Sequence, residues 1–526
     1  MPAPFSSLIN PSLWDRRTFL KAAAVAASWP LWQMRSGHAL DRKIDLQSYP
    51  FQLGVASGDP LPDGVVLWTR LAPKPLEGGG MPEEDVLVQW LVAADEGMKD
   101  IVQKGTAVAS HGWAHSVHVE VSGLEPDRVY WYQFIAAGET SPVGRTRTAP
   151  AADKMLDRFR FAFASCQHFE TGLFTAYDHM SKDDLNLVVH LGDYIYEAKG
   201  QANRIRQHHG NKLQTLDDYR ARHAQYRSDV HLQAAHAAFP WLVTWDDHEV
   251  ENNYANDISE KAGFDPVKFL KQRAAAYQAY YEHMPLRVSA IPQGPLMNLY
   301  RAATFGPLIQ FAVLDTRQYR TDQPCGDKLI APCDEVYDPN ATLLGQPQED
   351  WLMKTLSSSG SAWNVLAQQV MIARVDQLPG EGTAIQMDQW SGYDVARKRL
   401  LQSISDRKIV NPVVITGDIH SNWVNELKVD FDRPESATIA PEFVGTSISS
   451  GGDGFQSRPK SDAVLAENPF VKFFNAERGY VRCDLNQKVW RSDYQTVEYV
   501  TRPGAPLMTR ASFEVEAGRP TIQRVS

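Results

Sequence analysis

The sequence has few cysteines, no excess of positive charge and no long apolar run. Four cysteines occur among 526 residues, and the formal net charge is −10. Without a global basic field, the chain is not typical of nucleic-acid-binding proteins, so we expect nucleic acid only as a conceivable substrate. No apolar stretch approaches the roughly 20 residues of a membrane-spanning helix. Hydrophobic residues, at 43%, are numerous enough for a large core, which excludes disordered and collagen-like classes.

The first 39 residues have the organisation of a secretory signal. Arg16 and Arg17 precede an apolar stretch at 22–32, and small residues follow around Ala39. This order predicts a cleaved signal peptide over 1–39. The paired arginines are typical of the twin-arginine route, which exports folded proteins. We therefore expect the twin-arginine translocation machinery as a partner and a periplasmic or secreted location; the alternative is an amphipathic N-terminal helix.

Two cysteines lie close together in a loop-like segment. Cys325 and Cys333 are separated by Gly-Asp-Lys-Leu-Ile-Ala-Pro. In the oxidising environment that an exported protein meets, this pair is expected to form a disulfide. Cys483 is expected to be a strand residue, whereas Cys166 directly follows a predicted strand and is a candidate ligand.

The character of the sequence changes near residue 150. Before this point, short strand-like stretches are separated by Gly, Pro and Asp, as in an antiparallel β-sandwich. The segment 124–127 ahead of Tyr130 and Tyr132 resembles the tyrosine corner of fibronectin type III domains. A Pro/Ala-rich stretch over 146–154 indicates a boundary. We expect a small fibronectin type III-like β-sandwich over 40–150 and a second domain over 151–526. The first contains predicted strands at 64–68, 86–90, 115–121 and 128–134.

The second part alternates apolar, strand-like runs with helical segments. Helical spacing occurs over 217–239 and 393–404, and 511–516 is a further strand-like segment. Buried runs that alternate with helices predict a mixed α/β (α+β) domain, in which two sheets pack face to face with helices outside. The predicted strands are 159–164, 187–191, 241–245, 308–314, 363–366 and 413–416.

Polar side chains follow five of these strands at the points where they end. α/β folds bind ligands at the carboxyl ends of strands, and the residue types here offer thiolate, carboxylate, phenolate, amide and imidazole groups. Each residue alone has a structural explanation, such as a turn or a buried core side chain. The ordered set instead predicts one metal site. The segments are 165–167, 192–197, 246–253, 315–317 and 417–420.

Three of these motifs resemble those of the alkaline phosphatase D (PhoD) family, among the purple acid phosphatase-like and calcineurin-like metallophosphoesterases. They are Asp-x-x-Tyr after Val-Val-His-Leu-Gly, then Trp-Asp-Asp-His-Glu-Val-Glu-Asn-Asn, then Gly-Asp-Ile-His-Ser-Asn-Trp. The segment 51–60 and the twin-arginine signal also match, so the resemblance covers essentially the whole chain. It implies a two-sheet metallophosphoesterase sandwich flanked by helices, after an N-terminal sandwich. The implied activity is hydrolysis of phosphate mono- and/or diesters through a metal-bound hydroxide.

The resemblance also implies two metal ions, Fe³⁺ and Ca²⁺. Asp193 would bridge them, and the second site would include Asp418 and a residue from 246–253. Hard oxygen donors and a phenolate suit Fe³⁺, and a carboxylate- and amide-rich site suits Ca²⁺. Cys166 stands where many relatives have aspartate, and Asp418 where many have histidine. The ligands implied for the first metal are Cys166, Asp193, Tyr196 and His420.

The third motif leaves its ligand open. Asp247 overlays the asparagine of the Gly-Asn-His motif of relatives and is the first choice, with Asn252 or Asn253 as the alternative. The following His248 is implied to stabilise the transition state or to protonate the leaving alkoxide.

Three further segments carry less specific signals, and two of them have two interpretations each. Arg317 either clamps a phosphate oxygen or forms a salt bridge with Asp315. The pair at 208–209 belongs to a mobile flap over the site or to a plain exposed loop. The Gly-rich segment 449–454 lacks the setting of a phosphate-binding P-loop and is predicted to be a loop near the site.

Two alternative functions remain open. One keeps the fold but takes phospholipid or teichoic-acid-like polymers as the phosphate ester substrate, as a phospholipase D-like diesterase would. The other is a non-catalytic surface-binding protein with a degenerate metal domain. The second alternative predicts missing ligands, yet every expected position holds a ligand-type residue.

Overall fold

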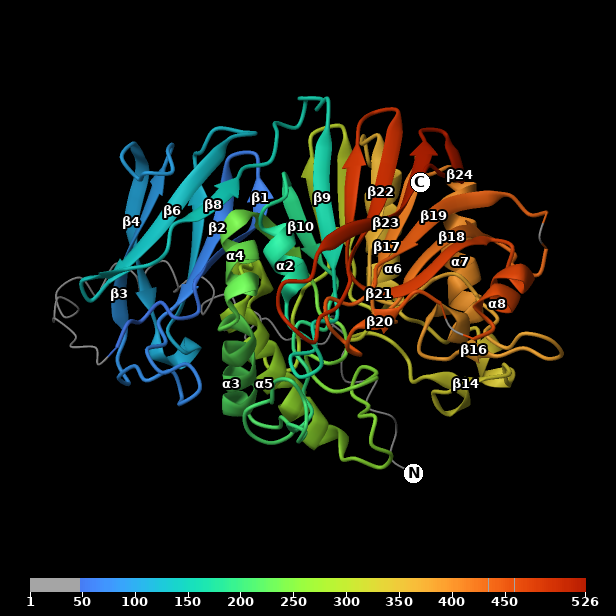
Figure 1. The fold of residues 1–526 in the computed structure, drawn as a ribbon, viewed down its shortest axis with the longest axis horizontal. Coiled ribbons are helices and arrows are strands. Elements are labelled where there is room, and N and C mark those ends of the chain that lie inside the picture. Colours follow the sequence, from blue (N-terminus) through green and yellow to red (C-terminus); the bar gives the residue numbers. More distant parts are fainter. Residues whose placement is uncertain (1–47, 434, 458) are drawn as a thin grey trace, which may run out of the picture.

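A computed structural model describes residues 48–433, 435–457 and 459–526. The predicted signal peptide over 1–39 lies outside these described residues. Within them, no helix is both long enough and apolar enough to cross a membrane. Figure 1 shows two groups of strands packed side by side, with helices on their outer faces.

At the centre of the first sheet lie β9 (Phe159–Ala164), β10 (Leu187–His190) and β11 (Pro240–Val243), which are parallel to one another and to β1 (Val55–Leu61), the next strand. Beyond β11 come β1, β2 (Gly64–Arg70) and β5 (Ser116–Ser122). Beyond β9 the order is β21 (Val471–Leu485), β22 (Val489–Val497), β23 (Leu507–Glu516) and β24 (Arg519–Arg524).

The second sheet has four parallel strands flanked by antiparallel neighbours. Its order is β12 (Arg301–Phe305), β13 (Ile309–Val313), β15 (Trp363–Ala367), β17 (Pro412–Thr416), β19 (Thr438–Val444) and β18 (Asn422–Lys428). The long strand β21 pairs with β18 through its first half and with β9 through its second half. This shared strand connects the two sheets.

The sequence of β9 shows how the layers form. Phe161 and Phe163 point into the core between the sheets, while Ala162 and Ala164 face the helices on the other side. The small alanines let the helices pack closely against the sheet. The outer helices of the first sheet are α2 (Thr175–Met180), α3 (Leu216–Arg227), α4 (Val230–Ala238) and α5 (Pro266–His283). Those of the second are α6 (Gly345–Ser357), α7 (Asp394–Asp406) and α8 (Ser461–Glu467). The predicted fold class is confirmed.

One predicted helix is two. The segment 217–239 divides into α3 and α4 because Ser228 ends the first, and the Asp229 carboxylate caps the second by accepting from the N–H groups of His231 and Leu232.

The N-terminal strands form a sandwich in which a second sheet covers β1, β2 and β5. At its predicted corner, Tyr130 Oη accepts a hydrogen bond from the Glu125 N–H at 2.9 Å. Because β1 pairs with β11, this sandwich shares a sheet with the rest of the chain, and the division into domains near residue 150 stays a prediction. The covering sheet contains β3 (Val86–Ala93), β4 (Ile101–Ala109), β6 (Val129–Ala136), β7 (Glu139–Thr140) and β8 (Gly144–Arg147).

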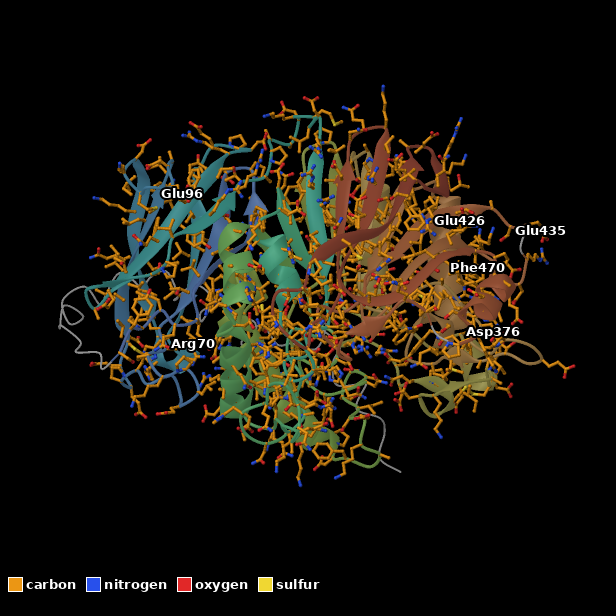
Figure 2. All side chains as sticks on the ribbon, in the orientation of Figure 1. Arg70, Glu96, Asp376, Glu426, Glu435 and Phe470 are labelled. Carbon is orange, nitrogen blue, oxygen red and sulfur yellow. A yellow bond between two sulfur atoms is a disulfide. The ribbon has the colours of Figure 1, made fainter. Side chains whose placement is uncertain are left out.

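Polar contacts also connect the sandwich to the helices. Arg70, at the end of β2 and labelled in Figure 2, donates to the Ala114 carbonyl at 2.8 Å. Its Nη1 lies 2.7 Å from Nε2 of His283 in α5.

The predicted disulfide is present. Cys325 and Cys333 are bonded at 2.08 Å, whereas Cys166 and Cys483 are free and buried, the latter in β21 as expected. The disulfide loop includes β14 (Leu329–Ile330), which pairs with β16 (Ile385–Gln386). The remaining short elements are β20 (Gly454–Phe455) and 3₁₀ helices at His111–Trp113, Val288–Ala290, Pro324–Gly326, Asp334–Tyr337 and Trp390–Gly392.

Candidate metal centre

The carboxyl ends of the parallel strands in both sheets meet at one edge of the sandwich. The loops after β9, β10 and β11 gather below the first sheet in Figure 1, close to β20 and β21. Gln369, after β15, connects the two sets of strand ends, since its Nε2 donates to Thr244 Oγ1 (3.2 Å) and to the Leu314 carbonyl (3.0 Å). Polar residues from distant parts of the sequence therefore surround one small volume.

The four ligands implied for the first metal are brought together. One ligand atom each from Cys166, Asp193 and His420 lies within 4.8 Å of the others. The phenol of Tyr196 donates to Asp193 Oδ2 at 2.9 Å and lies 3.1 Å from His420 Nε2. Burial lowers the pKa of His420 to about 3, which keeps the imidazole neutral and able to bind a cation.

A second, carboxylate-rich group adjoins the first. Asp193, Asp247 and His248 form one cluster, and Asp246, Asp247 and Asp418 form another. Asp193 belongs to a cluster on each side, and its role as a bridge between two cations stays a prediction. Asp246 was not among the predicted ligands, although its position directly after a strand end, next to Asp247, was a signal for it.

Three carboxylate oxygens in these clusters accept no hydrogen bond from the described residues, although Asp247 Oδ1 lies 3.4 Å from Arg317 Nη2. They are Asp193 Oδ1, Asp246 Oδ2 and Asp247 Oδ1, and all three are buried. A buried acceptor without a hydrogen bond is costly, and carboxylates are ligands of hard cations. The donor set therefore fits bound metal ions.

The pKa values of the clustered carboxyl groups reflect their burial and their closeness to one another. Burial, with added repulsion from neighbouring carboxylates, raises the pKa of Asp193 and Asp418 well above the ordinary value. Burial also raises the pKa of Asp246 to about 7, although Arg317 opposes it, and that of Glu249 to about 8 against its backbone N–H donors. Bound cations would reverse these shifts by stabilising the charged forms.

The backbone is left-handed at four of the ligand-type residues. The φ angles are 61° at Cys166, 55° at Asp193, 67° at Asp418 and 52° at His420. Such conformations are unfavourable for residues other than glycine, persist only when their surroundings hold them, and cluster at functional sites.

The structure distinguishes between the candidates of the third motif. Asp247 lies in both carboxylate clusters, and its Oδ2 accepts from the Asn253 N–H at 2.8 Å. The Asn252 amide donates to Glu260 at 2.7 Å, and the Asn253 amide donates to Asp327 at 2.6 Å. The geometry thus favours Asp247 and directs the Asn252 side chain to a carboxylate outside the clusters.

His248, a member of one of these clusters, forms an ion pair with the buried Glu197. Its Nδ1 lies 2.7 Å from Glu197 Oε2, and its Nε2 lies 4.0 Å from Asp247 Oδ2. Burial opposes a charged imidazole, but Asp247, Glu197 and Asp193 outweigh it and raise the pKa of His248 well above the ordinary value. The imidazolium in turn outweighs burial at Glu197 and lowers the pKa of that carboxyl to about 2. His248 is therefore equipped to hold a proton.

Arg317 corrects the sequence interpretation. The predicted salt bridge with Asp315 is wrong, because only the backbone N–H of Arg317 reaches that carboxylate, at 3.0 Å. Its fully buried guanidinium instead donates to Asp246 at 2.5 Å and to Asp388 at 2.8 and 2.9 Å. Its donors are directed to carboxylates in this structure, and a role as a phosphate clamp stays a prediction. The side chain supplies a fixed positive charge within the acidic cluster.

Comparisons with known proteins agree with this geometry. The model of the PhoD-like phosphatase family matches residues 161–494, and that of its N-terminal domain matches residues 37–150. Alkaline phosphatase D of Bacillus subtilis (strain 168) is 51% identical over 522 residues, which cover 98% of this chain and 89% of that protein. The chain belongs to the PhoD-like phosphatase family. It is therefore a phosphoesterase, and the alternative of a non-catalytic binding protein is wrong.

Solved structures support the family assignment to different degrees. A structure of PhoD superposes with a TM-score of 0.90 at 53% identity, covering 92% of this chain and 93% of that one. GAP50 of Plasmodium, an inner-membrane-complex anchor, aligns over 69% of this chain and 90% of its own, with a TM-score of 0.35 and 11% identity. The second similarity is too low to inform either fold or function.

Two loops with predicted positions in this PhoD-like phosphatase are those at 208–209 and 449–454. The pair at 208–209 lies in a loop whose residues are mostly exposed, but His208 itself is buried, with Nε2 2.9 Å from Tyr226 Oη. The Gly-rich loop does lie near the site, since Ser450 Oγ is 2.7 Å from Tyr196 Oη.

Proposed function

We propose that this phosphoesterase is metal-dependent and hydrolyses phosphate monoesters and/or diesters. The observation that carries the proposal is the buried set of carboxylates, three of whose oxygens accept no hydrogen bond, in overlapping clusters linked through Asp193 and Asp247. A protein does not bury such charge without compensation, and cations are the compensation that carboxylate, thiolate and phenolate groups attract.

The residues divide into two donor sets. Cys166, Tyr196 and His420 would hold Fe³⁺ together with Asp193, because a phenolate and a carboxylate suit a hard trivalent ion. The oxygen-only set of Asp246, Asp247 and Asp418, which Asp247 links to the cluster of Asp193, suits Ca²⁺. When bound, two such cations neutralise phosphate oxygens and activate a water for attack on phosphorus.

His248 would act as the general acid. Its Nδ1 is held by Glu197 and its ring lies against that of Tyr196, with centroids 4.2 Å apart, so the imidazole has one orientation. Nε2 then faces the carboxylate clusters, where a leaving alkoxide needs a proton. Arg317 has a supporting role, as its buried charge holds Asp246 in place.

A lipid substrate is the second candidate. Leu329 and Ile330 are exposed at the tip of the disulfide loop, whose Asp327 accepts a hydrogen bond from Asn253 beside the site. Exposed apolar side chains on this loop would favour a phospholipid over a small, hydrated ester. Replacing both with serine should lower hydrolysis of phospholipid vesicles while leaving a small soluble diester unaffected.

Export by the twin-arginine route is proposed from the sequence signal. Replacing Arg16 and Arg17 with lysine should retain the folded enzyme in the cytoplasm of the producing cell. Periplasmic or secreted activity at the wild-type level in that variant would contradict the proposed route.

The test of the catalytic proposal is reconstitution. Protein treated with a chelator should lose hydrolysis of p-nitrophenyl phosphate and bis(p-nitrophenyl) phosphate, and should regain it with Fe³⁺ and Ca²⁺ together. The ratio of the two rates would give the preference between mono- and diesters. Full activity after exhaustive chelation would overturn the metal dependence.

A further inference from the structure

Glu249 accepts three backbone hydrogen bonds from two separate loops of the metal centre. Its Oε1 accepts from the Tyr194 N–H at 2.6 Å, and its Oε2 accepts from the N–H groups of Asp193 at 3.1 Å and Asp246 at 2.9 Å. The side chain is 1% exposed. All three donors are backbone amides, so the carboxylate matches them without a side-chain partner.

In the short loop 192–194, two backbone N–H groups have their hydrogen-bond acceptor in this carboxylate. The carbonyls of its first two residues accept from the N–H groups of Cys166 and Gln167, at 3.1 Å each. The Tyr194 carbonyl accepts from Gln167 Nε2 at 2.8 Å. The N–H groups of the last two residues remain, and both donate to Glu249. Buried backbone donors require such an acceptor.

The conformation of this loop needs support from outside. Asp193 has a φ of 55°, and a Cβ at Gly192 would lie 2.4 Å from the Asp246 nitrogen. The loops after β10 and β11 are therefore in direct contact, and a left-handed aspartate is held between them. A strained residue keeps its geometry only where neighbouring groups determine it from several sides.

We propose that Glu249 is a positioning residue, which fixes the Asp193 and Asp246 carboxylates in the geometry that cation binding requires. The inference rests on the metal dependence proposed above, and Glu249 itself would touch neither cation nor substrate. Only a carboxylate on a side chain of this length can accept the hydrogen bonds from both loops. A glutamine would turn an NH₂ group toward a backbone N–H, and an aspartate would be one methylene too short to reach both loops.

The matched control is Glu251, two residues further along the chain. It is also buried, but its carboxylate binds Lys212 at 2.9 Å and Ser259 at 3.0 Å, outside the clusters. A comparison of Glu249→Gln with Glu251→Gln therefore holds residue type, segment and burial nearly constant.

The experiment measures Ca²⁺ binding by titration calorimetry on the chelator-treated full chain, with thermal unfolding of the metal-free protein alongside. Glu249→Gln should bind Ca²⁺ about 10- to 100-fold more weakly than wild type, as for other groups that orient ligands. Glu251→Gln should bind like wild type. After reconstitution, kcat on bis(p-nitrophenyl) phosphate should fall in Glu249→Gln while KM changes about twofold or less, and Glu249→Asp should restore part of both properties.

Wild-type Ca²⁺ affinity in Glu249→Gln would overturn the positioning role and leave the metal dependence intact. A wild-type protein that binds no Ca²⁺ would overturn the proposed metal dependence, and this inference with it. If Glu249→Gln does not fold, Glu249→Asp decides: weaker binding with an unchanged thermal midpoint supports the role, and unchanged binding overturns it.

Discussion

Arg317 donates two parallel hydrogen bonds to Asp388, at 2.8 and 2.9 Å, and both side chains are buried. Arg320 lies 3.0 Å from the same carboxylate. Burial would raise the pKa of Asp388, but the two arginines outweigh it and hold that pKa below the ordinary range. Asp388 anchors the Arg317 guanidinium, which also contacts Asp246. The positive charge of Arg317 therefore balances part of the negative charge of the acidic cluster.

Removing the Asp388 charge should destabilise the protein strongly. Asp388→Asn leaves the buried Arg317 with an incomplete set of partners, which typically costs about 3–5 kcal/mol. Urea unfolding of the metal-free protein measures this. The control is Asp432→Asn, because Asp432 pairs with Arg374 at 2.7 Å but is 67% exposed, and such pairs contribute less than about 1 kcal/mol. Equal stability of the two variants would contradict the role of the buried pair.

The same carboxyl predicts a pH dependence. Its folded pKa is depressed below an unfolded value of about 3.9, so it contributes its full stability above that pH and loses it as pH falls through the folded pKa. The stability difference between wild type and Asp388→Asn should thus be constant near neutral pH and shrink below about pH 4. Urea titrations from neutral to acidic pH measure the difference. A difference independent of acid would contradict the assignment.

The disulfide should stabilise the loop beside the site. Replacing Cys325 and Cys333 with serine removes a short closed loop and should cost about 2–3 kcal/mol. Activity should also fall, because Gln323, just before the disulfide loop, donates to Asp388 at 2.8 Å. Thiol titration of the denatured wild type should give two free thiols before reduction and four after it. Four thiols without reductant would show that the bond is absent.

The proposed acid should matter most for poor leaving groups. His248→Gln should lower kcat by about 10²- to 10⁴-fold on an alkyl phosphate ester, whose alkoxide needs a proton, and by less on a p-nitrophenyl ester. His209→Gln is the control, since His209 is exposed and outside the clusters. Equal losses on both esters would argue that His248 does not donate the proton.

The parts that the sequence predicts are those encoded locally. Apolar runs identify the strands, and the three-residue spacing of Asp193 and Tyr196 places both side chains at one point after β10. The break at Asp229 was missed because helical spacing continues through a residue that caps the next helix.

The parts that were missed depend on long-range contacts. Arg317 binds Asp388, which lies 71 residues further along the chain. Because Asp388 follows no predicted strand, no local pattern in the sequence indicates this contact. Glu249 resembles any acidic residue until the two loops that it joins are seen together. Burial of His208 likewise follows from packing against Tyr226, not from its polar surroundings in the sequence.

The most direct test of the metal centre is elemental analysis of the purified enzyme beside Cys166→Ala and Asp193→Ala. Cys166 belongs to one cluster and Asp193 to clusters on both sides, so the two variants separate the sites. Cys166→Ala should lose iron and retain calcium, and Asp193→Ala should lose both. Iron at the wild-type stoichiometry in both variants would contradict the account.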